Sequence, residues 1–63
     1  MALMQIYDGL ENPPMLLERR SAQTVEELIR QADALSKKEH VEGYPRNTYI
    51  VYNNDGERVY QRW

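Results

Sequence analysis

The chain has 63 residues, no cysteine and a formal net charge of −2, from 8 Lys and Arg against 10 Asp and Glu. The lack of cysteine excludes disulfides and thiolate metal sites, and the acidic balance argues against a general nucleic-acid binder, which concentrates basic residues. No run approaches the roughly 18 apolar residues of a membrane span and residues 1–7 are too short for a signal peptide, so we expect one cytoplasmic domain, residues 1–63, without a membrane partner.

The first third of the chain predicts two strands. Residues 3–7 alternate weakly between apolar and polar side chains and predict a strand at the edge of a sheet. The Asp-Gly at residues 8–9 predicts a turn, and the Asn-Pro-Pro at residues 12–14 interrupts regular structure. Residues 15–21 predict a second strand, in which two adjacent leucines leave open which side chains face the core.

A helix is predicted over residues 25–39. Thr24 is a good N-cap, and Glu27 three positions later completes a capping box. Acidic residues in the first turn and lysines in the last turn match the helix dipole. One stripe at helical spacing is apolar and predicts the buried side. It consists of Val25, Leu28, Ile29, Ala32 and Leu35.

The C-terminal residues predict a β-hairpin, because two β-prone runs flank the Asn-Asn-Asp-Gly at residues 53–56. We favour a type I turn closed by a left-handed Gly56, which makes a three-residue loop with a G1 bulge. The resulting pairs are Asn53 with Glu57, Val51 with Val59, and Tyr49 with Gln61. A two-residue Asp-Gly turn, which stays open, would pair Tyr52 with Val59 instead.

The register determines which side chains meet the helix. In the favoured register the helix side receives Tyr49, Val51, Val59 and Trp63. The outer side then carries Ile50, Tyr52, Arg58, Tyr60 and Arg62. The two-residue turn would move Ile50 and Tyr52 to the helix side. In both registers, alternation along the last strand places Arg58, Tyr60 and Arg62 on the face opposite to that of Val59. The whole pattern predicts an α+β fold: an antiparallel sheet of three to four strands in the order β(β)αββ, with one helix packed on one face.

No group of residues predicts catalysis, a metal site or a cofactor. Ser21 lies just ahead of the helix, where a turn or cap explains a serine, and Ser36 lies near the end of the helix. Neither serine has the neighbouring base that a nucleophile needs. His40, the single histidine, has no second histidine at ligand spacing. Glu26 and Glu27 are adjacent, so a helix separates them by about 100° and cannot aim both at one substrate. We therefore expect no enzymatic activity.

The predicted outer face of tyrosines and arginines is the feature that points to binding. The chain has five Tyr, one Trp and no Phe, and Tyr, Trp and Arg dominate protein-binding hot spots. Tyrosines beside arginines also stack bases and hold phosphates. A third interpretation is that cross-strand Tyr–Arg pairs only stabilise the sheet. The acidic total charge favours a protein partner over nucleic acid.

The last 40 or so residues also resemble a recurring small-domain pattern. The matching stretches are Thr24-Val-Glu-Glu-Leu-Ile-Arg-Gln-Ala, Leu35-Ser-Lys-Lys, Tyr49-Ile-Val-Tyr and Asp55-Gly56-Glu-Arg. This layout of a capped helix before an Asp-Gly hairpin resembles uncharacterised bacterial and prophage domains, and some small phage anti-CRISPR proteins. The resemblance is generic and implies no functional residue.

From these observations we expect a non-enzymatic protein-binding module. The resemblance implies a phage or mobile-element inhibitor that occludes a multiprotein host defence complex of CRISPR type. The predicted contact residues are Ile50, Tyr52, Arg58, Tyr60 and Arg62. Two alternatives stay open: a small nucleic-acid-associated regulator, and a homodimer that pairs through a strand or through the Tyr-rich face.

Overall fold

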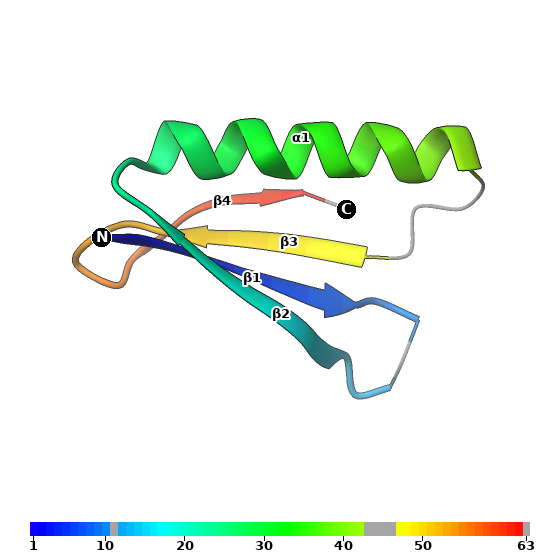
Figure 1. Ribbon diagram of the computed structural model, residues 1–63. Helices are drawn as coiled ribbons and strands as arrows, with labels where there is room; N and C mark the ends of the chain where they lie inside the picture. Colours follow the sequence, from blue (N-terminus) through cyan, green and yellow to red (C-terminus); the bar gives the residue numbers. More distant parts are fainter. Residues whose placement is uncertain (11, 43–46, 63) are drawn as a thin grey trace.

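A computed structural model describes the backbone of residues 1–10, 12–42 and 47–62, and their side chains except those of residues 39–42. The elements in chain order are β1 (Ala2–Asp8), β2 (Met15–Ala22), α1 (Val25–Glu42), β3 (Asn47–Tyr52) and β4 (Arg58–Arg62). The four strands form one antiparallel sheet in the order β2-β1-β3-β4, and α1 lies across one face of it (Figure 1). The predicted α+β fold and the order of its elements are confirmed.

The first strand lies in the centre of the sheet. The prediction of an edge position for residues 3–7 is wrong, because β1 pairs with β2 on one side and with β3 on the other. Every second residue of β1 is buried, which is the pattern of a strand with one face on the core. The edges of the sheet are β2 and β4 instead.

The helix begins where the capping box predicts it. Thr24 Oγ1 accepts a hydrogen bond from the backbone N–H of Glu27 at 3.3 Å. α1 ends at Glu42, three residues beyond the predicted end, since no strong helix breaker occurs before Gly43. Among the described residues, no helix combines the length and the apolar character that crossing a membrane requires.

The hydrophobic core lies between α1 and the sheet. Leu28 and Ala32 of α1 are fully buried against Met4 of β1 and Val51 of β3. Val25, Ile29 and Leu35 of the predicted apolar stripe are partly buried around this centre. The complete set of buried hydrophobic residues is Ala2, Met4, Ile6, Ala22, Leu28, Ala32, Tyr49 and Val51.

The loop of the C-terminal hairpin has the predicted three residues. The backbone N–H of Asn53 donates to the Glu57 carbonyl at 2.9 Å, and the N–H of Gly56 donates to the Asn53 carbonyl at 3.1 Å. Gly56 has a φ of +81°, the left-handed conformation that closes this loop. The Asn53 side chain further accepts hydrogen bonds from the N–H groups of Asp55 and Glu57.

A second bulge changes the register beyond the loop. Tyr52 pairs with Arg58, but Val51 pairs with Tyr60 rather than with Val59. Val59 is therefore an extra residue on β4, and it is 45% exposed instead of packed against α1 as predicted. The predicted pairs Val51–Val59 and Tyr49–Gln61 are wrong for this reason: the observed partners are Tyr60 and Arg62. The predicted position of Trp63 lies outside the described residues.

Candidate functional site: the open face of the sheet

The candidate site is the face of the sheet opposite α1. Strand alternation and cross-strand pairing place eleven described residues there, because directly paired residues share a face. We call them together the open face. They are Leu3, Gln5 and Tyr7 of β1, Leu16, Arg19 and Ser21 of β2, Thr48, Ile50 and Tyr52 of β3, and Arg58 and Gln61 of β4.

These residues form rows across the four strands. One row runs Ser21, Leu3, Tyr52, Arg58, and the next runs Arg19, Gln5, Ile50, Gln61. Leu16, Tyr7 and Thr48 begin a third row. The apolar and aromatic side chains thus lie mainly on the two central strands, while each edge strand contributes one arginine.

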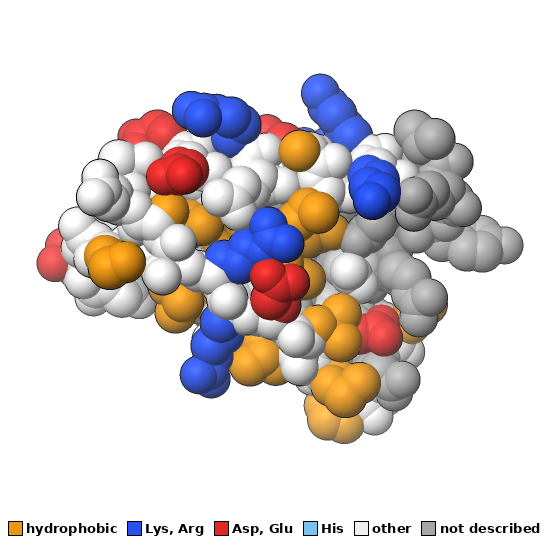
Figure 2. All heavy atoms as spheres, viewed as in Figure 1, with side chains coloured by type: hydrophobic (Ala, Val, Ile, Leu, Met, Phe, Trp, Pro, Cys, Tyr) orange, Lys and Arg blue, Asp and Glu red, His pale blue; other side chains and the backbone are white. Residues whose placement is uncertain are grey.

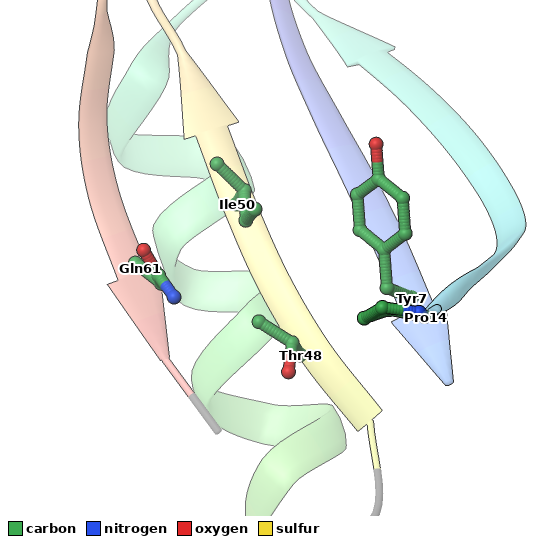
Figure 3. A pocket seen from close by; sticks show the side chains of 5 residues that line it. All are labelled: Tyr7, Pro14, Thr48, Ile50 and Gln61. Carbon is green, nitrogen blue, oxygen red and sulfur yellow. The ribbon is translucent and has the colours of Figure 1, made fainter. Parts of the chain in front are cut away.

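A shallow hollow opens beside Tyr7. It has a volume of about 340 Å³ and is lined by Tyr7, Pro14, Thr48, Ile50 and Gln61. Figure 3 shows the Tyr7 ring nearly face-on along β1, with Ile50 and Thr48 on the neighbouring strand and Gln61 at the far side. The Tyr7 hydroxyl donates to Gln5 Oε1 at 2.9 Å, which holds the ring along the strand. The hollow therefore combines an apolar floor with a few polar groups, as binding sites do.

A second hollow lies at the other end of the open face. Its volume is about 370 Å³, and its lining includes Leu3, Gln5 and Tyr52 together with Asn53 and Asn54 of the hairpin loop. Tyr52 contributes an aromatic ring to the lining of this hollow, as Tyr7 does to the lining of the first one. The open face is therefore not flat along its central strands, because it has a hollow at each end.

The charge of the open face differs from that of the whole chain. Its charged residues are Arg19 and Arg58, and among the described residues no carboxylate shares this face. Glu18 pairs with Ile6 and so lies on the helix side, where it forms a 2.5 Å ion pair with Arg20. Arg58 Nη1 donates to Gln61 Oε1 of the same strand, β4, at 3.3 Å. An acidic protein thus presents a locally cationic surface here.

Exposed apolar side chains extend from the open face to the start of β2. Met15, Leu16 and Leu17 are 51%, 37% and 49% exposed. Figure 2 shows orange side chains at the lower end of the view, where Figure 1 places the start of β2. Three consecutive exposed apolar residues are unusual on a surface that contacts only water, and they are typical of a contact region.

The structure brings three of the five predicted contact residues together. Ile50, Tyr52 and Arg58 lie on the open face. The prediction that Tyr60 and Arg62 lie there is wrong, because the bulge at Val59 turns both toward α1. Asp33 of α1 accepts a 2.5 Å hydrogen bond from the Tyr60 hydroxyl and lies 3.3 Å from Arg62 Nη1. The hydrogen bond to Asp33 and partial burial raise the pKa of Tyr60.

Sequence reasoning missed Tyr7, Leu3 and Arg19 as members of this face. The alternation in residues 2–8 already predicts which side chains of that strand point the same way. What was missing was the central position of β1, which brings its outer side chains next to those of β3.

Ser21 and Ser36, the two serines of the sequence, lie on opposite sides of the sheet. Ser36 has no exposed surface, Ser21 lies at the edge on β2, and the His40 side chain is outside the described residues. No three described acidic or histidine side chains are grouped as metal ligands. Comparisons with models of protein families, with curated proteins and with solved structures find no match to this chain.

Proposed function

We propose that this chain is a non-enzymatic protein-binding module whose contact surface is the open face. The observation that carries the proposal is the composition of that face: an apolar and aromatic centre on two strands, one arginine on each edge strand, and no helix covering it. Protein interfaces have this arrangement, with a buried aromatic centre inside a polar rim.

The most sensitive position in this surface is Ile50. It lies on a central strand, it lines the hollow beside Tyr7, and it pairs with Gln5 on one side and Gln61 on the other. Tyr52 lies two residues along the same strand and belongs to the second hollow. A partner that covers both hollows buries Ile50 from all sides.

The experiment is capture of partners from a host lysate with the intact chain as bait, followed by measurement of affinity. Ile50→Lys is expected to weaken binding at least about tenfold, because it places an unpaired charge in the centre of the contact. Ala34→Lys is the matched control, since Ala34 is exposed on α1, away from the open face. Equal affinity of the two variants would contradict the proposal.

The resemblance to small phage anti-CRISPR proteins suggests the first partner to test. A multiprotein host defence complex recovered at both low and moderate salt would support inhibition by occlusion. The wild-type chain should then inhibit the activity of that complex, and the Ile50→Lys variant should leave the activity unchanged. This pair of results would connect the open face to the inhibition.

Single-stranded nucleic acid is a second candidate, favoured by one observation. Tyr7 and Tyr52 lie on the two central strands with Arg19 and Arg58 on the edge strands, an arrangement in which aromatic rings stack bases. Two cations make few phosphate contacts, so the logarithm of affinity would fall with the logarithm of salt with a slope of only about −1.4. Titration of a labelled oligothymidylate at several salt concentrations tests this function. Absence of binding at low salt would contradict the nucleic-acid-binding function.

A further inference from the structure

We propose that the open face seats an amphipathic helix of the partner that is acidic along both flanks of its apolar stripe. This inference rests on the proposed protein-binding function and names the chemistry of the partner. It follows from the width of the sheet, the apolar centre of the open face and the sign of its charges.

The width of the face fits one helix. Arg19 and Arg58 lie on the outermost strands, three strand spacings or about 14 Å apart across the sheet and one row or about 7 Å apart along it, so their backbones are separated by about 16 Å. A helix with its side chains is about 10–12 Å across. A single helix therefore covers the central strands and leaves one arginine beside each flank, as α1 covers the opposite face of the same sheet (Figure 1).

The centre of the face matches an apolar helix stripe. Leu3, Tyr7, Ile50 and Tyr52 all lie on β1 and β3, and each is partly exposed. The hollow beside Tyr7 gives a recess for one large apolar side chain of the stripe, with the Tyr7 ring as its wall (Figure 3). A helix whose apolar residues recur every three to four positions presents such a stripe.

The charges select an acidic partner and exclude a second copy of this chain. Two copies packed through their open faces would bring arginines together with no described carboxylate of that face to pair them. The solvent side of α1 is no better as an occupant. Its exposed described residues are Glu26, Glu27, Arg30, Ala34, Lys37 and Lys38, which form no apolar stripe.

The experiment is a selection from a display library of a three-helix scaffold in which one helix face is randomised. The library is panned against the wild-type chain and, separately, against the double variant Arg19→Glu/Arg58→Glu. We expect apolar stripes flanked by Asp and Glu on the wild-type chain, and by Lys and Arg on the double variant. Clones from the wild-type chain should bind the double variant at least about tenfold more weakly.

Two controls locate the binding. Lys37→Glu/Lys38→Glu changes the net charge by the same amount on α1, and it should leave the affinity of the selected clones within about twofold. Ile50→Lys should abolish their binding. Circular dichroism of each variant confirms that the fold is retained, since all of these positions except Ile50 are exposed and Ile50 is half-buried.

The outcomes separate this inference from the proposed function. Clones that require Ile50 but show no preference for acidic flanks would overturn the inference and leave the protein-binding function standing. Clones that bind Ile50→Lys as tightly as the wild-type chain would overturn both. Selection that yields no binder, or a second copy of the chain found on the open face by sedimentation and cross-linking, would also overturn the inference.

Discussion

Asp33 of α1 holds the two polar side chains of β4 that lie on the helix side of the sheet. Its Oδ1 atom is 2.5 Å from the Tyr60 hydroxyl and 3.3 Å from Arg62 Nη1. The ion pair is more than a third exposed at both ends, so it contributes little to stability. The hydrogen bond from Tyr60 has a charged acceptor and is the stronger of the two contacts. These residues therefore stabilise the joint between α1 and β4.

The raised pKa of Tyr60 predicts a loss of stability at alkaline pH. The folded-state pKa lies above the ordinary value near 10.0, so the folded state holds the phenolic proton more tightly than the unfolded state. The hydrogen bond contributes fully below pH 10, and its contribution is lost as the pH rises through the raised value. Urea unfolding between about pH 8 and 11 should show a steeper decline for the wild-type chain than for Tyr60→Phe. Parallel declines would contradict this account.

The hairpin formed by β3 and β4 shows that local turn chemistry and strand register are separate problems. The loop has the predicted length and Gly56 the predicted left-handed backbone. The bulge at Val59 then moves Tyr60 into the pair with Val51. The prediction that Tyr60 and Arg62 lie on the outer face is wrong because side chains alternate between the two faces only along an uninterrupted strand.

Substitution of Gly56 tests the loop. A Cβ atom at this position would meet nothing within 4 Å, so the cost of a side chain comes from the backbone alone. We expect Gly56→Ala to lower the free energy of unfolding by about 1 kcal/mol, since a left-handed conformation is unfavourable for alanine. Gly56→Asn should cost less, because asparagine tolerates this conformation. Urea unfolding measures both variants, and equal losses would show that the backbone conformation is not the cause.

The molecule as a whole consists of two layers and one uncovered face. The helix covers the side of the sheet that holds Met4, Tyr49 and Val51, whereas Tyr7, Ile50 and Tyr52 point the other way. An antiparallel sheet is stable with one face in water, so the fold itself needs nothing on the open face. Apolar side chains kept there are available for a partner.

Neighbouring residues of β3 distinguish the two faces. Val51→Lys is expected to prevent folding, because Val51 has no exposed surface and a buried unpaired ammonium is very unfavourable. Ile50→Lys should change the free energy of unfolding by no more than about 1 kcal/mol, since a lysine on the open face reaches water. Thermal unfolding followed by circular dichroism compares them. Similar losses for both variants would contradict the assignment of the faces.

The features that depend on neighbours in the chain were predicted correctly from the amino-acid sequence. The capping box at Thr24 set the start of the helix, helical spacing selected its buried stripe, and the Asn-Asn-Asp-Gly run set the hairpin loop. Of the predicted contact residues, Ile50 and Tyr52 were placed correctly because the extra residue lies on β4 and leaves the alternation of β3 intact. Arg58 was placed correctly because it precedes the extra residue Val59.

The features that depend on residues far apart in the chain became visible only in the folded molecule. The central position of β1 arises from pairing with β3, whose paired residues are 39 to 49 positions away in the chain, and it brings Tyr7 beside the outer residues of β3. Likewise, Tyr60 and Arg62 face Asp33, an acceptor on another element. Alternation along one strand carries no information about a bulge that forms against its partners, because the favourable contacts that stabilise the bulge lie across the sheet and on the helix.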